Sequence, residues 1–316
     1  MKKQANLKLK AAFGPLWNIF NNPDVNEIIV DHFDDVYYVE KGKIINNPKL
    51  FESEKEILTV INNLTKVAGK KFEGDVYHYD LNLPENVRVH VVLPPVSLNG
   101  PTLNLIKIPN QSFSLEDLYK WEALDDKSLH ILRSKINSHM SMLVAGPMGS
   151  GKTTLLNCIL NEIPAEERVV TIETTASLVL NRKRCVRLVP ENNHVTYTKE
   201  LIGASLKMRA DRIALAYMSG PESIDFTNAI RDGHTGYAGF TAENIFDVIR
   251  RLEIMMMGQD PGMSLDSVRY SIAQAFKLIV FQEKLDNGKR KVTNIAEIKY
   301  DAGEIKLGLV YKFQNN

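Results

Sequence analysis

The first third of the chain places hydrophobic and polar residues in a pattern that predicts strands with one helix between them. The runs EIIVD (27–31) and VYYVE (36–40) are β-branched and aromatic, and Lys41-Gly42 before KII (43–45) predicts a hairpin turn. VRVHVVLPP (87–95) and TLNLIKI (102–108) have the same strand-like composition. A helix behind Ser53 and ending at Gly69 is predicted by apolar residues at the helical period, namely Ile57, Val60, Ile61, Leu64 and Val67.

Beyond residue 113 the pattern becomes a regular alternation of apolar runs and helical stretches. Ser114 followed by Asp117 predicts a capped helix over LEDLYKWEAL. Further helices are expected from Lys152, around 198–208 and through 245–275. The expected strands are MLVA (142–145), RVVTIE (168–173), RIALAY (212–217) and LIVF (278–281). This alternation is typical of a parallel α/β sheet, and the turn Asp286-Asn287-Gly288 before KVTNIAEIKY predicts an antiparallel end.

The segment 109–113, which begins with PNQS, has the composition of a linker. We therefore expect an N-terminal α+β domain at 1–108, the linker at 109–113 and an α/β domain at 114–316. A chain of 316 residues that is 44% hydrophobic is long and apolar enough for two domains, and disorder is not expected.

Composition narrows the class of protein. The 39 basic and 38 acidic residues leave a net charge of +1, so no global field indicates a nucleic acid or an anionic membrane as the partner. No apolar run approaches the roughly 18 residues of a membrane-spanning helix. The start MKKQANLKLK is predicted to be a solvated amphipathic helix, because it lacks the apolar core of a secretory signal. Cys158 and Cys185 are expected to be reduced packing residues of a cytoplasmic protein.

The segment MLVAGPMGSGKTTLLN carries the strongest chemical signal in the sequence. Its G-x-x-x-x-G-K-[ST] spacing follows an apolar strand and precedes a helix, a context in which a chance glycine-rich turn is disfavoured. Glycines let backbone N–H groups surround phosphates, the helix N-terminus adds positive charge, Lys152 reaches the outer phosphates and Thr153 can ligate Mg²⁺. The expected nucleotide-binding residues are Gly146, Gly149, Ser150, Gly151, Lys152, Thr153 and Thr154.

From about Asp24 to Ile298 the chain also resembles secretion ATPases of the type II/type IV superfamily. The likeness is closest to the motor ATPases of tight-adherence (Flp) pili and to the hexameric ATPases of type IV secretion. In the first part it rests on VNEIIVD, VYYVEKGKI, RVHVVLPPVSLNGPTLNLIK and LEDL. In the second part it rests on the phosphate loop, VVTIETTASLVL, LKMRADRI, SGPES, GHTG and IRRLEIM, in the family's order.

This resemblance implies a PAS-like N-terminal domain and a RecA-like P-loop ATPase domain that binds ATP with Mg²⁺. It implies a ring, sixfold and made of this chain alone or mixed with a paralogue, at the cytoplasmic face of the inner membrane. Platform proteins of a pilus or secretion system are the implied partners, and no direct contact with nucleic acid is expected. The nucleotide would lie between the two domains, with Arg88 and Lys107 facing its phosphates.

Four segments depart from the family's usual motifs. An acidic box of the form I-E-D-T-x-E-L is here Ile172 to Leu178, and of its three acids only Glu173 is present. A strand that usually ends in Gly-Glu ends here in Ala216 and Tyr217. Of the two histidines of the family's histidine box, this chain has His234, and Thr241 or Ala242 lies near the place of the second. The arginine that the family usually has in the strand before the linker corresponds here to Ile106, beside Lys107.

These departures leave alternatives for individual residues. Glu173 is either the catalytic base or a structural partner of Arg209 or Arg212. His234 either senses the γ-phosphate or bonds within its own turn, and Tyr217 is neutral near pH 7 and packs at a strand end. The basic cluster Arg182, Lys183, Arg184 and Arg187 reads as a solvated face, with an acidic subunit or a nucleotide as the alternative.

Two functions are therefore compatible with the sequence. The first is a motor ATPase that drives pilus assembly or macromolecule export. The second is a nucleotide-binding pseudo-ATPase that acts as a structural or regulatory partner of an active paralogue. In either case binding is expected to be intact and hydrolysis slow or absent, because losing one positioned catalytic group commonly costs roughly 10² to 10⁴ in rate. A helicase or packaging motor is disfavoured by the balanced charge.

Overall fold

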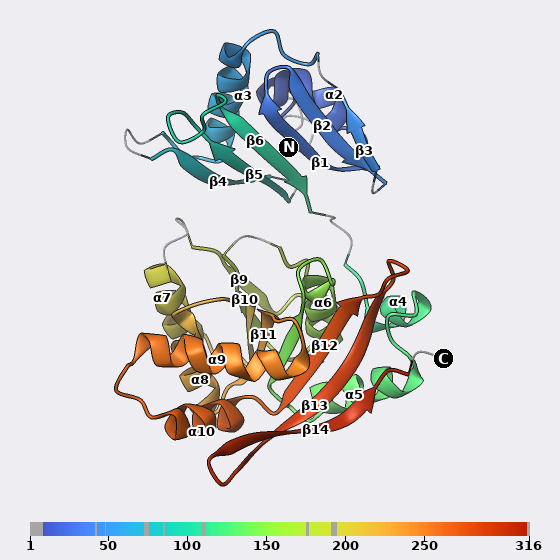
Figure 1. Cartoon of the computed structure of the whole chain (residues 1–316), viewed down its shortest axis with the longest axis vertical. Coiled ribbons are helices and arrows are strands. Elements are labelled where there is room, and N and C mark those ends of the chain that lie inside the picture. Colours follow the sequence, from blue (N-terminus) through green and yellow to red (C-terminus); the bar gives the residue numbers. More distant parts are fainter. Residues whose placement is uncertain are drawn as a thin grey trace. The chain divides into compact units, whose positions relative to one another are not determined.

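The structure is a computed structural model that describes residues 9–41, 43–47, 49–72, 76–84, 86–108, 112–174, 177–190 and 195–314. The chain divides into two compact units, Met1–Asn110 and Gln111–Asn316 (Figure 1). The division falls within the segment 109–113 that the sequence assigns to a linker. Residues 1–8 of the predicted N-terminal helix, Gly42 of the predicted hairpin turn and 175–176 of the acidic box lie outside the described residues.

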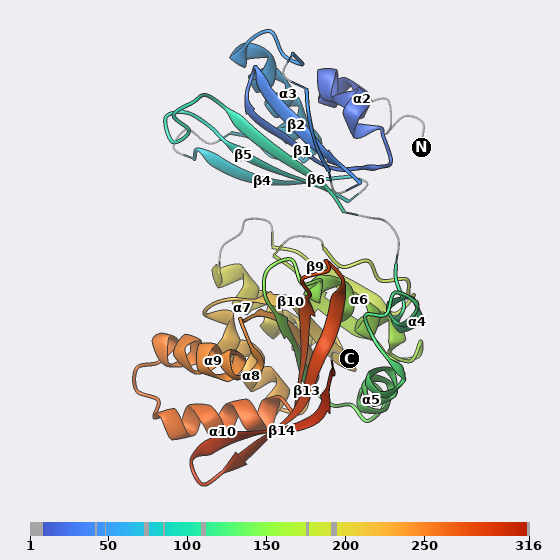
Figure 2. The ribbon, with the colours of Figure 1, turned by 45° about the vertical axis from the view of Figure 1, so that its right-hand side comes forward.

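The N-terminal unit is a six-stranded antiparallel sheet in the order β3-β2-β1-β6-β5-β4. Its helical elements lie on one face of the sheet (Figure 2). The strands are β1 (Val25–His32), β2 (Asp35–Glu40), β3 (Lys43–Asn46), β4 (His78–Leu83), β5 (Val87–Val92) and β6 (Thr102–Lys107). The helical elements are η1 (Gly14–Leu16), α2 (Trp17–Phe20) and α3 (Glu54–Val67).

Alternation along these strands separates a covered face from an open one. On β5, Val87, Val89 and Val91 are buried in the core that also holds Ile57 and Leu64 of α3. The residues between them are only partly buried, so they point to the opposite face. The predicted helix behind Ser53 and the strands at 27–31, 36–40, 87–95 and 102–108 are confirmed, whereas the prediction missed β4.

The C-terminal unit is built on an eight-stranded sheet in the order β14-β13-β12-β7-β11-β10-β8-β9. Strands β12, β7, β11, β10, β8 and β9 run parallel, and β13 and β14 continue the sheet antiparallel, as the Asp286-Asn287-Gly288 turn predicts. The strands are β7 (Met142–Gly146), β8 (Val169–Ile172), β9 (Cys185–Leu188), β10 (Arg212–Met218), β11 (Thr235–Thr241), β12 (Leu278–Lys284), β13 (Arg290–Asp301) and β14 (Glu304–Lys312).

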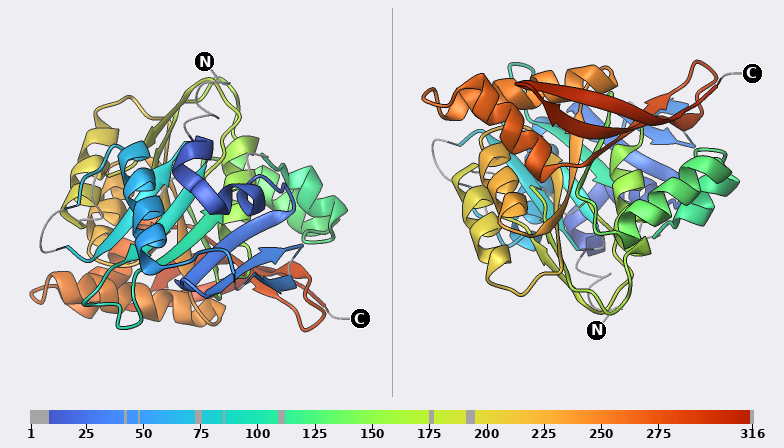
Figure 3. Two further views of the ribbon diagram at one scale, coloured as in Figure 1. Left: turned by 90° about the horizontal axis from the view of Figure 1, so that it is seen from above. Right: turned by 90° about the horizontal axis from the view of Figure 1, so that it is seen from below.

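Helices cover both faces of this sheet (Figure 3). Helices α4 (Leu115–Lys120), α5 (Asp126–Asn137) and α6 (Lys152–Glu162) pack on one face and share one apolar core with it. The other core holds α7 (Val195–Leu206), α8 (Glu222–Arg231), α9 (Ile245–Gln259) and α10 (Leu265–Ala275). On β7, Leu143 and Val144 belong to different cores, because neighbouring strand residues point to opposite faces.

One predicted helix of this unit has a different extent. Ser114 and Asp117 form the expected capping box, but α4 ends at Lys120, so LEDLYKWEAL is not one continuous helix. The chain turns at Glu122, whose φ of 59° is left-handed, and α5 begins after its own cap, Asp125. Cys158 and Cys185 are free thiols, and burial raises the pKa of Cys158 to about 12, as expected for a packing residue.

Candidate functional site

The phosphate loop connects the end of β7 to the first turn of α6, in the strand–loop–helix order that the motif requires. Gly149 and Gly151 have φ of 76° and 91°, a conformation that side chains other than glycine rarely adopt. Helix α6 begins after Gly151 without a side-chain cap and without an acidic residue in its first turn. Its first N–H groups and its positive end are therefore available to an anion.

Two glycines of the loop are required by close packing against the hairpin of β12 and β13. A Cβ on Gly146 would lie 2.0 Å from the carbonyl oxygen of Gln282, which is backbone and cannot move aside. A Cβ on Gly151 would lie 2.8 Å from Nε2 of Gln282 and 2.7 Å from Cδ of Arg290. A Cβ on Gly149 meets nothing within 4 Å, so that glycine serves the turn alone.

The side chains of the loop are arranged to receive phosphate and a metal ion. The Lys152 ammonium donates to the carbonyl oxygen of Pro147 at 2.7 Å, and burial lowers its pKa below the usual range. Ser150 is fully buried, and its hydroxyl has no hydrogen-bond partner among the described residues. Thr153 is exposed in the first turn of α6, where its hydroxyl can reach a ligand. Uncapped N–H groups, a lysine and this hydroxyl fit a nucleoside triphosphate with Mg²⁺.

No group of three or more His, Cys, Asp or Glu side chains among the described residues could hold a metal ion by itself. In P-loop proteins one or two protein ligands and the phosphates share the Mg²⁺ ion, and Thr153 is the residue of the loop that could supply such a ligand.

The ends of two parallel strands lie beside the loop. Thr241 of β11 pairs with Gly146, and the N–H of Ala242 donates to the carbonyl oxygen of Gly146 at 3.2 Å. Strand β10 is the neighbour of β11, and Tyr217 near its end is 41% exposed while Ala216 is buried. The tyrosine therefore stands at the same sheet edge as the phosphate loop, with a side chain that solvent reaches. The structure gives it an exposed position, whereas the sequence analysis expected it to be packed.

The position of His234 corrects the prediction that it senses the γ-phosphate. His234 comes immediately before β11, and the phosphate loop lies where β11 ends. Seven residues separate His234 from Thr241, which at about 3.3 Å per residue is roughly 23 Å. The imidazole therefore cannot contact a phosphate held by the loop of its own chain. Its Nδ1 atom is buried without a hydrogen-bond partner among the described residues, so the predicted bond within the turn is not recorded there either.

Glu173 follows β8 and is fully buried, with both carboxylate oxygens engaged. Oε1 accepts from Thr171 Oγ1 at 2.9 Å and from Arg187 Nε at 2.8 Å. Oε2 accepts from the N–H groups of Ser177 and Leu178, at 2.7 and 2.8 Å, and from Arg187 Nη2 at 3.1 Å. Strand β8 lies three strands from β7, roughly 14 Å at 4.8 Å per strand. This environment favours the structural alternative for Glu173.

The arginine that pairs with Glu173 is not one of the two named from the sequence. Arg212 is fully buried at the opposite end of the sheet, where it makes two hydrogen bonds to Glu167, at 2.5 and 3.0 Å, and one to Tyr237 at 2.6 Å. The partner is Arg187, whose pKa is raised chiefly by its hydrogen bond to Glu173. Arg187 on β9 meets Glu173 because β8 and β9 are parallel neighbours.

The prediction that the basic cluster forms a solvated face is also wrong for Arg182. Its guanidinium donates to the carbonyl oxygens of Leu160, Ile163, Pro164 and Glu167, at 2.6 to 3.2 Å. Burial lowers its pKa. Arg182 thus caps the C-terminal end of α6, where carbonyl groups lack helical partners and the helix dipole is negative. Three of the four cluster cations are bonded within the domain, because Arg184 also donates to the carbonyl oxygen of Glu166.

Arg88 and Lys107 of the N-terminal unit point to opposite faces of its sheet. Arg88 pairs across the ladder with Ile106, whereas Lys107 pairs with Val87, which is buried in the core. The Lys107 ammonium donates to the carbonyl oxygens of Phe20 and Asn22, at 2.9 and 2.5 Å. The prediction that both cations face one set of phosphates is therefore wrong for Lys107, because its charge is bound to the end of α2 on the covered face.

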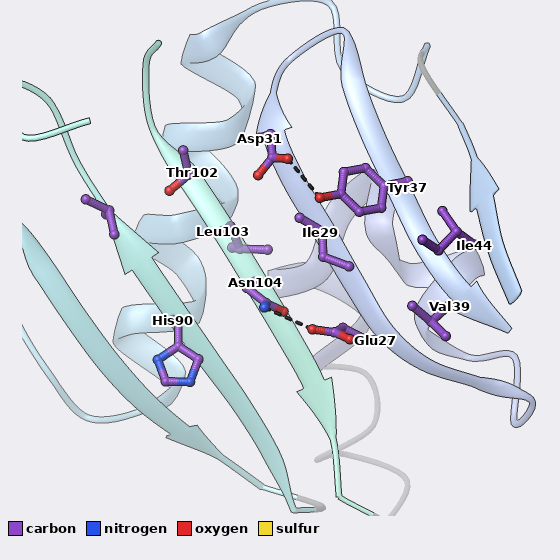
Figure 4. Close-up of a pocket in the computed structure, with 11 residues that line it drawn as sticks. Glu27, Ile29, Asp31, Tyr37, Val39, Ile44, His90, Thr102, Leu103 and Asn104 are labelled. Atoms are coloured by element: carbon purple, nitrogen blue, oxygen red, sulfur yellow. Dashed lines mark hydrogen bonds between the residues drawn. The ribbon is translucent and has the colours of Figure 1, made fainter. Parts of the chain in front are cut away.

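The open face of the same sheet has a shallow hollow of about 460 Å³ (Figure 4). Its lining includes the apolar side chains of Ile29 and Val39, and the carboxylates of Glu27 and Asp31 lie along it. Asp31 accepts from the Tyr37 hydroxyl at 2.9 Å, and Glu27 accepts from Asn104 at 3.0 Å. Carboxylates repel phosphate, so the two acidic side chains disfavour nucleotide binding in this hollow.

Gln282 and Arg290 are two residues of the β12–β13 hairpin that contact the phosphate loop, and neither was predicted from the sequence. Gln282 Nε2 donates to the carbonyl oxygen of Ser150 at 2.9 Å, and Arg290 Nε donates to that of Gly149 at 3.2 Å. They lie far from the loop in sequence, and no spacing rule joins them to it.

The sequence of the chain is similar to those of known secretion proteins. The family model described as "Type II/IV secretion system protein" matches residues 10–300. The type IV secretion system protein PtlH of Bordetella pertussis is 31% identical over 259 residues, covering 68% of this chain and 73% of the relative.

Two solved structures share the fold. The ATPase DotB of Legionella pneumophila matches with a TM-score of 0.62 at 17% identity, over 92% of this chain and 78% of its own. The pilus retraction motor PilT with bound ADP matches with a TM-score of 0.62 at 16% identity, over 90% and 79%. At this identity the likeness concerns the fold, an N-terminal domain followed by a RecA-like ATPase domain. With the family model matching almost the whole chain, the protein belongs to the type II/IV secretion system protein family.

Proposed function

We propose that this protein is a nucleotide-binding subunit of a type II/IV secretion or pilus machine, which binds ATP with Mg²⁺ and turns it over slowly. The observation that carries the proposal is the phosphate loop. Its glycines are fixed by the turn and by the adjoining hairpin, and it opens onto an uncapped helix that has no acidic residue in its first turn. Such an arrangement is stable only if the positive end of the helix serves an anion or water.

Each residue of the loop has a distinct role in this proposal. The N–H groups of Gly149, Gly151 and the first turn of α6 surround the phosphates. Lys152 leaves the carbonyl oxygen of Pro147 and binds the outer phosphates, and Thr153 and Thr154 offer hydroxyls in the first turn. When Mg²⁺ is bound, the ion neutralises phosphate charge during transfer. On the open face of the N-terminal sheet, Arg88 is the remaining candidate for a second basic contact.

Slow turnover is supported by the residues at the loop's edge of the sheet. Hydrolysis requires a group that orients or deprotonates the attacking water. Tyr217 stands where the family resemblance implies a glutamate, and a phenol does not act as a base near pH 7. Glu173 accepts five hydrogen bonds from its own domain, so a proton acceptor there would first have to give up Arg187. These two observations favour the second function as well, a pseudo-ATPase that works beside an active paralogue.

The proposed setting is a ring at the inner face of the cell membrane, sixfold and made of this chain or mixed with a paralogue. The names of the similar proteins, a type IV secretion system protein and a pilus retraction motor, support a membrane-associated machine with platform proteins as partners. Among the described residues no helix is both long and apolar enough to cross a bilayer. Flp-type pili remain the proposed system, and nucleic acid is not a proposed partner.

Equilibrium binding tests the proposal. Titration calorimetry with ATP and Mg²⁺ should give micromolar affinity for the wild type and a loss of at least about tenfold for Lys152→Ala, because a charge-assisted contact is removed. Lys127→Ala is the matched control, since Lys127 is an exposed lysine on α5. Equal affinities for wild type and Lys152→Ala would show that the loop does not bind the phosphates.

A further inference from the structure

The hairpin of β12 and β13 brings an arginine to the phosphate loop from more than a hundred residues away in sequence. Gln282 faces Val292 and Lys284 faces Arg290 in the hairpin register, with an irregularity between Phe281 and Gln282. Strand β12 also runs beside β7, with Phe281 opposite Ala145, so Gln282 arrives beside Gly146. The position of Arg290 is therefore set by two pairings of regular sheet.

Arg290 has unused hydrogen-bonding capacity. Its side chain is exposed, and Nε donates to the carbonyl oxygen of Gly149. Among the described residues no other hydrogen bond and no ion pair of the Arg290 side chain is recorded. A guanidinium has five N–H donors in a planar fork that matches phosphate oxygens. Four of these donors remain available at the loop.

Several positive charges gather around the loop. Lys152, Arg290 and the N-terminal end of α6 meet there, and the first turn of α6 has no acidic residue. The cations on either side of Arg290 are used elsewhere: Lys289 pairs with the Glu122 carboxylate at 2.5 Å, and Lys291 donates to the Glu122 carbonyl oxygen at 2.8 Å. Like charges repel each other, and an anion bound between them removes this repulsion.

Two buried polar atoms at the same place also lack partners. Gln282 is 2% exposed, and its Oε1 has no hydrogen bond among the described residues, although its Nε2 holds the carbonyl oxygen of Ser150. The Ser150 hydroxyl is likewise unpartnered and fully buried. Buried polar atoms without partners are rare, and at a loop of this kind they indicate a site that a polar ligand completes.

We propose that Arg290 is a second phosphate-binding cation of the nucleotide site, supplied by the chain's own C-terminal hairpin. This inference rests on the proposed function and adds a residue to the same site. On nucleotide binding the guanidinium exchanges the carbonyl oxygen of Gly149 for phosphate oxygens, and Gln282 holds the hairpin against the loop while it does so. The contact between the hairpin and the loop therefore changes when the loop binds phosphate.

The test compares three variants by titration calorimetry with MgADP and MgATP. Arg290→Ala should weaken both affinities by about tenfold or more, as expected for the loss of a charge-assisted contact. Arg290→Lys, which keeps the charge but loses the fork, should fall between Arg290→Ala and wild type. Lys289→Ala, which removes the neighbouring cation paired with Glu122, should stay within about twofold of wild type. Because the Arg290 side chain is exposed and the Lys289–Glu122 pair is a surface ion pair that contributes little, thermal unfolding of all three variants should stay close to that of the wild type.

The outcomes separate the inference from the function on which it rests. If Lys152→Ala loses affinity while Arg290→Ala stays within twofold of wild type, Arg290 does not bind phosphate and only the further inference fails. If Lys289→Ala weakens binding as much as Arg290→Ala, the effect is one of general charge and the inference also fails. If the wild type binds neither nucleotide, the proposed function itself is wrong.

Discussion

Glu173 and Arg187 form a bidentate ion pair at the end of β8, with Arg187 Nε 2.8 Å from Glu173 Oε1 and Arg187 Nη2 3.1 Å from Glu173 Oε2. The carboxylate is fully buried, and it also holds the N–H groups of Ser177 and Leu178. This pair therefore fixes the segment that follows β8 against β9. The one acid present from the acidic box is used to hold the backbone.

Glu173→Gln should therefore destabilise the protein with or without nucleotide. The glutamine amide can accept fewer hydrogen bonds than the carboxylate accepts. It also leaves the Arg187 guanidinium without a negative partner. Removing one partner of a buried pair typically costs about 3 to 5 kcal/mol, and we expect the lower figure because Arg187 is 31% exposed. Urea unfolding measures the change. A variant with unchanged unfolding free energy and abolished ATP hydrolysis would instead identify Glu173 as the catalytic base.

Gly146→Ala should be more harmful than its small size suggests. The new Cβ would meet the carbonyl oxygen of Gln282 at 2.0 Å, so β7 and β12 would have to separate. We expect the free energy of unfolding to fall by about 2 to 3 kcal/mol, which is in the range measured when a side chain is added to a tightly packed site. Gly258→Ala in α9 is the control: nothing lies within 4 Å of its Cβ, and a helical alanine should be neutral or stabilising by up to about 1 kcal/mol. Similar unfolding midpoints for the two variants would contradict the close approach.

The Glu167–Arg212 pair predicts a specific dependence of stability on pH. The hydrogen bond from Arg212 lowers the pKa of Glu167 from its ordinary value of 4.5. The stabilisation is therefore complete above pH 4.5 and is lost as the pH falls through the lowered pKa. Glu167→Gln should cost about 3 kcal/mol at pH 7, because Arg212 is fully buried, and this difference from wild type should shrink below pH 4.5.

Denaturant unfolding across pH 3 to 8 measures this dependence. Glu166→Gln removes an exposed neighbouring carboxylate for which the described part of the chain records no side-chain partner, so it should follow the wild-type curve. A Glu167→Gln curve parallel to wild type at every pH would contradict the assignment of the acid-sensitive stability to this pair.

Lys107 and Arg88 should separate stability from binding. Lys107→Met removes two hydrogen bonds to the end of α2, and we expect a loss of about 1 to 2 kcal/mol in unfolding free energy with ATP affinity unchanged. Arg88→Met should leave stability nearly unchanged, because Arg88 Nε is buried without a partner among the described residues, and it should weaken ATP binding. Weaker binding with unchanged stability in Lys107→Met would restore Lys107 as a phosphate contact.

The sequence predicts the parts of this protein that depend on local pattern. The phosphate loop, the capped start at Ser114 and the hairpin turn at Asp286-Asn287-Gly288 each follow from residues near one another, and all three are present in the structure. The role of Arg187 could not be predicted, because it depends on β9 lying parallel to β8. The contacts of Gln282 and Arg290 could not be predicted without knowing that β12 pairs with β7. The position of His234 depends on which end of β11 lies beside the loop.

The central claim is that ATP is bound but turned over slowly because Tyr217 stands in place of a carboxylate. The direct measurement is phosphate release at saturating MgATP, for wild type and Tyr217→Glu, with their ATP affinities matched by calorimetry. A typical enzyme turns over about 10 times per second, so a loss of roughly 10² to 10⁴ predicts about 0.1 per second or less for wild type. Tyr217→Glu should be measurably faster, with only a partial gain because Thr174, Ser177 and the missing second histidine are unchanged. A wild-type rate of several per second that does not rise in Tyr217→Glu would contradict the account.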